Sequence, residues 1–212
     1  MKRNRKMTEA KILEAVGRLL AGQGFEGLGV NAVAREAGVD KVLIYRYFGG
    51  LDELLRAFAG SSRFWPTREE ILGGALDDSG REDPAALSVR ILHGYLRELR
   101  VRPDSQEILR WELIRRNELT DELARVREAQ GLSWLDDLPA DLGARSGLDL
   151  AAVAALLHAG LVYLVLRAKT ADVYQGVDLR TESGWSRIEG AVDVLVRACF
   201  DHYGLVGRGK NE

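Results

Sequence analysis

The apolar residues of this 212-residue chain recur every three or four positions along almost its whole length. This spacing places them on one side of an α-helix, whereas a half-buried strand would alternate apolar and polar residues. No segment shows such alternation, and no internal repeat is visible. Glycines and prolines divide the pattern into about nine helical segments. We therefore predict an all-α protein.

The N-terminal part is predicted to hold four short helices. Thr8 is the expected N-cap of the first, and Gly22 and Gly24 end it. Gly49 and Gly50 separate the third helix from the fourth. The second, third and fourth helices are expected at about 30–37, 41–48 and 52–62.

The rest of the chain is predicted to form longer helices. Asp83 and Pro84 supply a cap and a first residue for one of them, and Pro103 marks its end. Thr120 is expected to cap a later helix. The other helices are expected at about 108–116, 123–130 (with an extension over 132–138), 149–169 and 183–203.

The formal net charge of −2 conceals an uneven distribution. Residues 1–50 hold nine basic and five acidic side chains, and residues 51–212 hold 21 basic and 27 acidic ones, so the two parts carry +4 and −6. Such asymmetry is typical of a basic module joined to an acidic body. We expect a domain over 1–50 with a mobile basic N-terminal arm, a helical body over 51–206 and a disordered tail over 207–212.

The chain offers few residues for catalysis or metal binding. One cysteine, Cys199, excludes an internal disulfide, and one cysteine with three histidines cannot form a structural zinc site. The segment GQGFEG at 22–27 has the spacing of a dinucleotide-binding loop, but it follows a predicted helix rather than a strand, which favours a simple turn. We therefore expect no catalytic residue, no metal and no cofactor.

Two features bear on location in the cell. The N-terminus is basic but has no apolar segment of the kind found in signal peptides. The run LDLAAVAALLHAGLVYLVL approaches membrane-spanning length, but it contains His158 and two glycines, and we interpret it as a helix of a soluble bundle. We expect a cytoplasmic protein with no membrane partner.

Residues 34–44, AREAGVDKVLI, have the spacing of a helix-turn-helix. Ala34 allows two helices to approach closely, and Gly38 suits a turn that needs a positive φ. Asp40 can cap the next helix, and Ile44 then points back into the core. This arrangement exposes the second helix for the major groove of DNA. An ordinary corner between two helices has the same spacing and remains the alternative.

The expected DNA contacts lie mainly on this second helix. Lys41 and Arg46 can reach phosphates or guanine edges, and Val42 and Leu43 can touch thymine methyl groups. The basic arm can follow the backbone or enter a minor groove. The full predicted set is Lys2, Arg3, Arg5, Lys6, Asn31, Lys41, Val42, Leu43, Tyr45, Arg46 and Tyr47.

The segment GFEGLGVNAVAREAGVDKVLIYRYFGGLDELLRAF, preceded by a capped helix, resembles the DNA-binding domain of TetR-family transcriptional regulators. The resemblance covers about residues 8–58 and rests on AxxAGV, on the aromatic pair Tyr45 and Phe48, and on the trailing LL. It implies a three-helix domain, a fourth connecting helix and a helical body that dimerises and often binds a small effector.

The chain departs from the family pattern at several positions. Gly29 stands where the family often has a threonine cap, and Leu51 where a lysine is common. Val42 and Leu43 replace the usual small residues of the recognition helix, so the base-reading face is more apolar. Arg46 and Tyr47 occupy positions that often carry tyrosine or histidine. No particular operator sequence follows from these residues.

The body is expected to hold a ligand pocket and a dimer interface. Polar-tipped side chains on otherwise apolar helices suit a pocket, although core or surface roles are the alternative. The predicted pocket residues are Tyr95, Trp111, Arg115, Trp134, His158 and Tyr163. The last helix repeats apolar residues in nearly a coiled-coil seam, so a four-helix interface between two subunits competes with packing inside one subunit. The predicted interface residues are Ala159, Gly160, Ile188, Ala191, Val192, Leu195 and Cys199.

These features together favour a homodimeric transcriptional regulator that binds a palindromic double-stranded DNA operator. We expect a repressor that an unknown small molecule releases by favouring a second conformation. The leading alternative is a helical small-molecule-binding protein or enzyme whose N-terminal domain has no DNA role. A dimeric adaptor that uses this domain for protein contacts is a third possibility.

Overall fold

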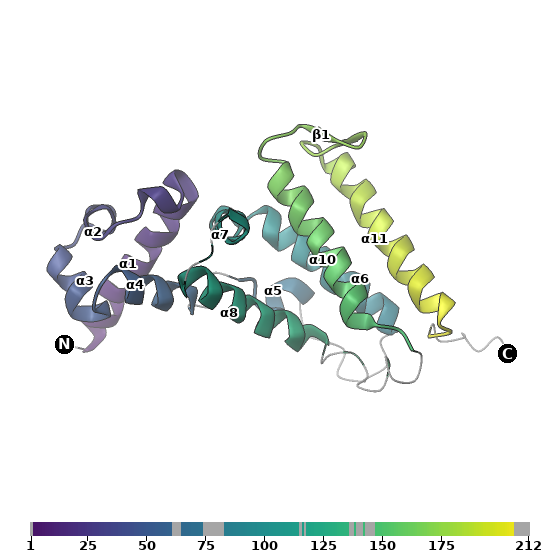
Figure 1. Cartoon of the computed structure of the whole chain (residues 1–212), viewed down its shortest axis with the longest axis horizontal. Coiled ribbons are helices and arrows are strands. Elements are labelled where there is room, and N and C mark those ends of the chain that lie inside the picture. The colour runs from purple at the N-terminus through teal and green to yellow at the C-terminus, as the bar shows by residue number, and fades with distance from the viewer. Residues whose placement is uncertain are drawn as a thin grey trace. The chain divides into compact units, whose positions relative to one another are not determined.

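The computed structural model describes residues 2–60, 65–73, 83–114, 116, 118–135, 138, 142 and 147–205. It confirms the all-α fold: the described residues form ten α-helices, one 3-10 turn and a single two-stranded hairpin (Figure 1). The chain divides into two compact units. Unit 1 combines Met1–Trp65 with Arg102–Ala129, and unit 2 combines Pro66–Val101 with Gln130–Glu212.

Unit 1 contains the N-terminal helices and a later pair. Its elements are α1 (Lys2–Gln23), η1 (Phe25–Gly27), α2 (Val30–Ala37), α3 (Lys41–Phe48), α4 (Leu51–Ala59), α7 (Pro103–Ile114) and most of α8 (Glu118–Leu135). Helix α1 packs against α2, α4 and α7, and α3 packs against α2 and α4. Fully buried aliphatic side chains fill the centre of this unit, including Ile12, Leu20, Ile44, Leu54 and Ile108.

Helix α1 begins six residues before the predicted cap. The prediction of a cap at Thr8 is therefore wrong, and the basic residues expected in a mobile arm lie within the helix. Thr8 lies inside the helix, and its hydroxyl donates to the Asn4 carbonyl oxygen at 2.9 Å. One helical turn is supported by the ion pair between Arg5 and Glu9, whose Nε and Oε1 atoms are 2.7 Å apart.

Helices α7 and α8 also begin earlier than their apolar pattern indicates. Pro103 ends the preceding segment as predicted, but it is also the first residue of α7, a position where its missing N–H costs nothing. Thr120 was predicted as a cap, yet it lies inside α8 and is only 3% exposed. The pattern missed the first turn of α7 because Ser105, Gln106 and Glu107 are polar but buried.

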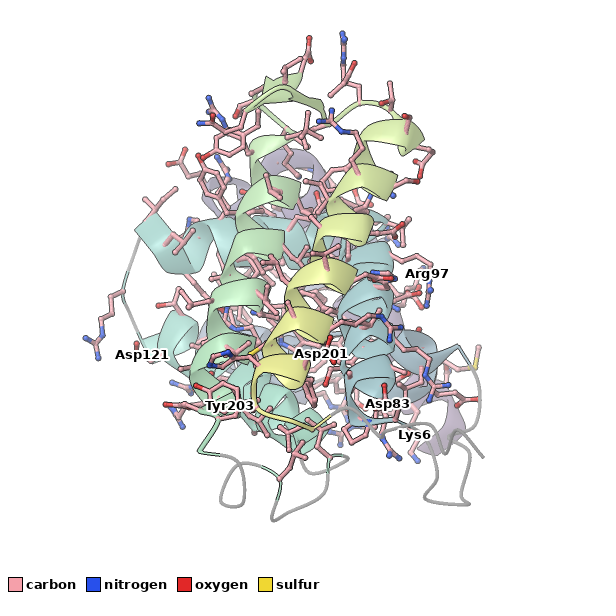
Figure 2. The ribbon with its side chains drawn as sticks, turned by 90° about the vertical axis from the view of Figure 1, so that its right-hand side faces the viewer. Lys6, Asp83, Arg97, Asp121, Asp201 and Tyr203 are labelled. Atoms are coloured by element: carbon pink, nitrogen blue, oxygen red, sulfur yellow. The ribbon has the colours of Figure 1, made fainter. Side chains whose placement is uncertain are left out.

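Unit 2 is built around α6 (Pro84–Arg100), which packs against α5 (Arg68–Leu72), α10 (Leu150–Arg167) and α11 (Glu182–His202). Four side-chain caps define the helix starts: Thr67, Asp83, Asp149 and Thr181 accept hydrogen bonds from the N–H groups three residues later. In Figures 1 and 2, α10 and α11 lie side by side, with α6 next to them. The buried contacts come from Tyr95, Leu96, Leu99, Leu161, Val165, Trp185, Val192, Val196 and Phe200.

Helix α5 was not predicted, and a glycine explains how it fits against α6. A Cβ atom on Gly94 would lie 1.9 Å from the Ile71 carbonyl oxygen, so only glycine allows this approach. Arg97 donates to the carbonyl oxygens of Glu70 and Ile71 at 3.0 and 3.3 Å and so satisfies the end of α5 (its position is labelled in Figure 2).

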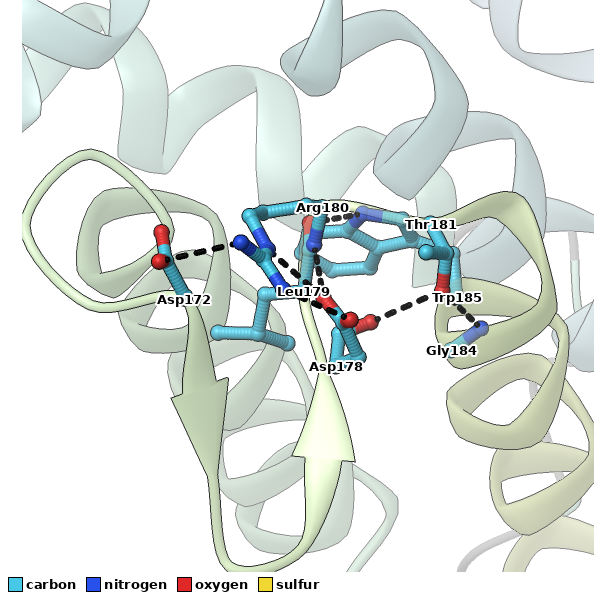
Figure 3. Close-up of polar contacts among 7 residues, drawn as sticks. All are labelled: Asp172, Asp178, Leu179, Arg180, Thr181, Gly184 and Trp185. Carbon is cyan, nitrogen blue, oxygen red and sulfur yellow. Dashed lines mark hydrogen bonds and ion pairs between the residues drawn. The ribbon is translucent and has the colours of Figure 1, made fainter.

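A short antiparallel hairpin joins α10 to α11 and corrects the prediction of a loop there. Strands β1 (Val173–Tyr174) and β2 (Val177–Asp178) are connected by Gln175 and Gly176, which both have positive φ. Arg180 closes the base of the hairpin by pairing with Asp172 and Asp178, each at 3.2 Å (Figure 3). Two-residue strands are too short for an alternating pattern to appear in the sequence.

Candidate nucleic-acid interface

The turn between α2 and α3 has the geometry that its sequence predicts. Gly38 has φ 61° and ψ 42°, a left-handed conformation. The Gly38 N–H donates to the Arg35 carbonyl oxygen and the Val39 N–H to the Ala34 carbonyl oxygen, which closes α2. Asp40 then caps α3 by accepting from the Val42 N–H at 2.8 Å. These bonds fix the direction in which α3 leaves the turn.

Helix α3 buries one side and exposes the other. Ile44 is fully buried and anchors α3 to the rest of unit 1. The exposed stripe consists of Lys41, Val42, Tyr45 and Arg46, which follow each other at the spacing of one helix face. Leu43 and Tyr47, which were also predicted to contact DNA, are half-buried. We call the four exposed residues the α3 stripe.

The charges near the α3 stripe are distributed unevenly. Within the described residues, neither Lys41 nor Arg46 has an acidic partner, whereas Arg18 is paired with Glu36 at 2.6 Å. Asp40 is the one acidic residue next to the stripe in sequence, and its carboxylate is used in the helix cap. The two basic groups of the stripe are therefore available to phosphate oxygens or base edges.

The basic residues of α1 occupy different settings. The Arg5 guanidinium lies over the Tyr47 ring, 5.1 Å from its centroid, so it lies beside α3. Lys6 is exposed (Figure 2), as is Asn31 at the start of α2. The side chains of Lys2 and Arg3 lie outside the described residues. Tyr47, expected to face DNA, instead meets Arg5.

A comparison with known families decides what this domain is. Residues 12–58 match the family of bacterial regulatory proteins named tetR. The chain carries the DNA-binding domain of the TetR family. The match runs from the middle of α1 to near the end of α4 and therefore contains the turn at Gly38 and the whole α3 stripe. With this domain, the protein is a DNA-binding transcriptional regulator.

Solved structures extend the likeness to nearly the whole chain. A TetR-family transcription regulator from Marinobacter aquaeolei VT8 shares 21% identity and a TM-score of 0.62, covering 93% of this chain and 98% of its own. A putative TetR-family transcriptional regulator from a Rhodococcus species shares 26% identity and a TM-score of 0.60, covering 89% and 98%. The fatty acid degradation regulator FadR from Bacillus halodurans shares 18% identity and a TM-score of 0.63, covering 89% and 94%. No curated protein matches the sequence significantly.

Sequence reasoning missed the contribution of α7 to the unit that carries the α3 stripe. Trp111 of α7 stacks on Phe25, with ring centroids 3.7 Å apart and planes 9° from parallel. It was predicted as a pocket residue, and the structure places it against the turn that follows α1. The two residues are 86 positions apart, so no local sequence pattern could reveal this stack.

A buried carboxylate lies further along α7. Glu112 Oε2 is 2.8 Å from a guanidinium nitrogen of Arg127, and Oε1 is buried with no hydrogen-bond partner among the described residues. Arg127 also lies over the Trp65 ring, 5.9 Å from its centroid. Loss of hydration on burial raises the pKa of Glu112 to about 7, and the positive charge of Arg127 only partly opposes this rise.

The structure separates the other predicted pocket residues. Tyr95 and His158 meet in unit 2, with ring centroids 4.4 Å apart. Tyr163 instead contacts Tyr174 of the hairpin edge-on at 5.4 Å. Arg115 and the side chain of Trp134 lie outside the described residues. The predicted pocket remains a prediction.

The predicted interface residues lie on two sides of their helices. Ala159, Gly160, Ala191 and Leu195 are exposed, Ile188 and Cys199 are half-buried, and Val192 is buried. The same outward side carries apolar residues that the sequence reasoning missed, namely Leu156, Tyr163 and Val194. We call the outward side of α10 and α11 the α10–α11 face. By length and composition α10 could span a membrane, and 11% of it is buried in the described structure.

The described residues give no sign of a metal centre, since they contain no group of three or more histidine, cysteine or acidic residues that could hold an ion. The charged clusters that are present connect helices or close turns. Arg100, for example, lies 4.7 Å from the Trp185 ring centroid and also pairs with Glu182, and this pairing lowers the pKa of Glu182.

Proposed function

We propose that this protein is a transcriptional repressor that binds a palindromic DNA operator as a homodimer and leaves it when a small molecule binds. The α3 stripe is the observation that carries the proposal. It combines two basic residues that have no acidic partner among the described residues with an aromatic and an aliphatic side chain on one exposed helix face. A recognition helix needs this mixture, because phosphates attract the basic groups and base edges contact the rest.

The α10–α11 face supports the dimer. Leu156 and Val194 are 76% and 67% exposed, and alanines and Gly160 lie beside them. A soluble monomer rarely exposes a continuous apolar patch of this kind. A second copy that presents the same face would cover it in a two-fold symmetric four-helix contact, and small residues would allow close approach. The same contact accounts for an apolar α10 in a cytoplasmic protein.

The effector step rests on how the helices are shared between the units. Helices α7 and α8 lie in the sequence between two segments of unit 2. All of α7 and most of α8 nevertheless belong to unit 1, which carries α3. A ligand that favours one arrangement of these helices would change the spacing of the two recognition helices of the dimer. Half-sites about 34 Å apart would then no longer be matched. The protein acts by binding in this proposal, and it catalyses no reaction.

The test is DNA binding by the purified protein to its own upstream region at two salt concentrations. We expect binding that weakens steeply with salt, since phosphate contacts release counterions. Arg46→Ala and Lys41→Ala should each reduce affinity about tenfold and reduce the salt slope by roughly two, because the dimer loses one phosphate contact in each half-site. Lys169→Ala, an exposed lysine of unit 2, is the control and should change neither.

A reporter gene under the same upstream region tests the direction of regulation. We expect expression to rise when the regulator is deleted and to fall when it is supplied again. Salt-insensitive or absent binding to DNA would contradict the DNA-binding role, and a drop in expression on deletion would identify an activator instead.

A further inference from the structure

The α3 stripe contains one aliphatic residue, and its setting is informative about the DNA it meets. Val42 is 61% exposed, although it is the second residue of α3 and follows directly on the capped turn. The core of the domain does not use this side chain, because Ile44 fills that role with no exposed surface. Lys41 and Arg46 flank Val42 on the same face.

Val42 is also held rigidly. Its N–H is bonded to the Asp40 carboxylate at 2.8 Å, which fixes the first turn of α3. A valine in a helix has one strongly preferred χ1 rotamer, so the direction of its two methyl groups is set by the backbone. The first residues of a recognition helix are those that reach base edges in the major groove. Val42 therefore presents a fixed apolar surface where bases are read.

The neighbouring residues are less suited to this contact. Leu43 was expected to share it, but this side chain is half-buried. Tyr45 is 55% exposed and carries a hydroxyl that suits phosphate or polar base atoms. The C5-methyl group of thymine is the apolar feature that the major groove offers. Cytosine and guanine would leave Val42 opposite polar groups, which costs hydration without a compensating hydrogen bond.

We propose that Val42 selects thymine in each half-site of the operator by contact with its C5-methyl group. This inference rests on the proposed function, because it specifies the DNA that the same site binds. Replacing thymine by deoxyuridine removes only that methyl group and keeps every hydrogen bond of the base pair. The substitution should weaken binding about fourfold per half-site, the change that corresponds to ~0.8 kcal/mol for one buried carbon group.

The experiment begins with duplexes selected from a random pool by the full-length protein. Each thymine of the selected half-site is then replaced in turn by deoxyuridine, and Kd is measured at one fixed salt concentration. We expect one position per half-site at which the replacement weakens the wild type but not Val42→Ala. Val42→Thr, which keeps the branched shape but replaces one methyl by a hydroxyl, should show reduced sensitivity at the same position.

The controls separate this inference from the proposed function. Val101→Ala alters a valine that is 69% exposed in unit 2, and it should bind and discriminate like the wild type. The Val42 contact alone would be overturned if the protein binds DNA tightly but every deoxyuridine replacement has the same effect on the wild type and on Val42→Ala. Failure to select any duplex would overturn the DNA-binding function, and the Val42 contact with it.

Discussion

The two units of this chain depart from the usual distribution of side chains in opposite ways. Unit 1 buries charge: on α7, Glu107 is buried and the Glu112 side chain is only 9% exposed, and burial raises the pKa of Asp104 on the same helix. Unit 2 exposes apolar groups along the α10–α11 face, where Leu156 and Val194 are largely open to solvent. Each departure lowers the stability of an isolated subunit.

This difference indicates the kind of partner each unit meets. The exposed residues that unit 1 offers a partner on the α3 stripe are two basic side chains, a tyrosine and a valine, a mixture that suits a nucleic acid. Those of unit 2 are aliphatic or small, as a second copy of the same helices requires. The α3 stripe thus suits DNA and not a second copy of the chain, and the α10–α11 face suits a second copy and not DNA. Substitutions that change the charge or the apolar character of either surface test this difference.

The largest effect is expected from a charge on the α10–α11 face. Leu156→Glu should convert the dimer to a monomer, because two buried carboxylates would face each other across the two-fold axis. Loss of the second half-site should reduce DNA affinity about 100-fold or more. Sedimentation and DNA titration measure the two consequences.

Leu113→Glu is the matched control for this change. Leu113 is 78% exposed, slightly more than Leu156, but it lies on α7 in unit 1. We expect this variant to stay dimeric. A Leu156→Glu protein that remains a dimer would show that the α10–α11 face is not the subunit contact. The apolar surface of unit 2 would then no longer indicate a second copy of the chain as its partner.

The buried charge of unit 1 predicts a pH dependence. Glu112 has an ordinary pKa of 4.5 and a pKa of about 7 in the folded chain, so the folded state holds its proton more tightly than the unfolded state. Stability should therefore fall as the pH rises from about 4.5 to about 7, and stay level above that. The loss amounts to roughly 3 kcal/mol, since each pKa unit corresponds to about 1.4 kcal/mol.

Glu112→Gln isolates this contribution because it keeps an oxygen for Arg127 but cannot titrate. Urea unfolding at pH 5 and pH 8 should show a smaller difference for the variant, which should be the more stable protein at pH 8. Glu128→Gln, on the exposed side of α8, should behave like the wild type. Equal pH dependence in all three proteins would mean that Glu112 is charged and hydrated in the fold.

The two units also differ in how far their sequence predicts them. The α2–α3 turn was predictable because Gly38 and Asp40 act on neighbouring residues, and local patterns report such effects. The stack of Trp111 on Phe25 was not, since it depends on packing between distant segments. In unit 2, the apolar seam of α11 was visible, but Val192 faces inward and Val194 outward. Periodicity shows that a helix has apolar sides without showing which partner covers each side.

A smaller effect is expected at the turn that orients the α3 stripe. Gly38→Ala places a side chain at φ 61°, where the Cβ atom meets the following carbonyl, and should reduce the unfolding free energy by about 1 kcal/mol. Gly22→Ala is the control, since Gly22 lies within α1, and a Cβ there meets no atom within 4 Å. It should raise stability slightly. Equal effects of the two substitutions would contradict a strained left-handed turn at Gly38.

The smallest effect concerns whether the first turns of α1 belong to the surface of unit 1 or project as a free arm. Arg5→Gln removes the ion pair with Glu9 and the contact with the Tyr47 ring, which should lower the unfolding free energy by about 0.5–1 kcal/mol. Lys6→Gln removes a neighbouring charge that makes no such ring contact in the described structure, and it should leave stability unchanged. Urea unfolding at low and high salt separates the two contributions, because salt weakens the ion pair more than the stacking of the guanidinium on the ring. Equal stabilities of both variants would mean that the Arg5 side chain makes no stabilising contact with Glu9 or Tyr47. Arg5 would then be a mobile DNA contact, and α3 alone would form the ordered basic surface of unit 1.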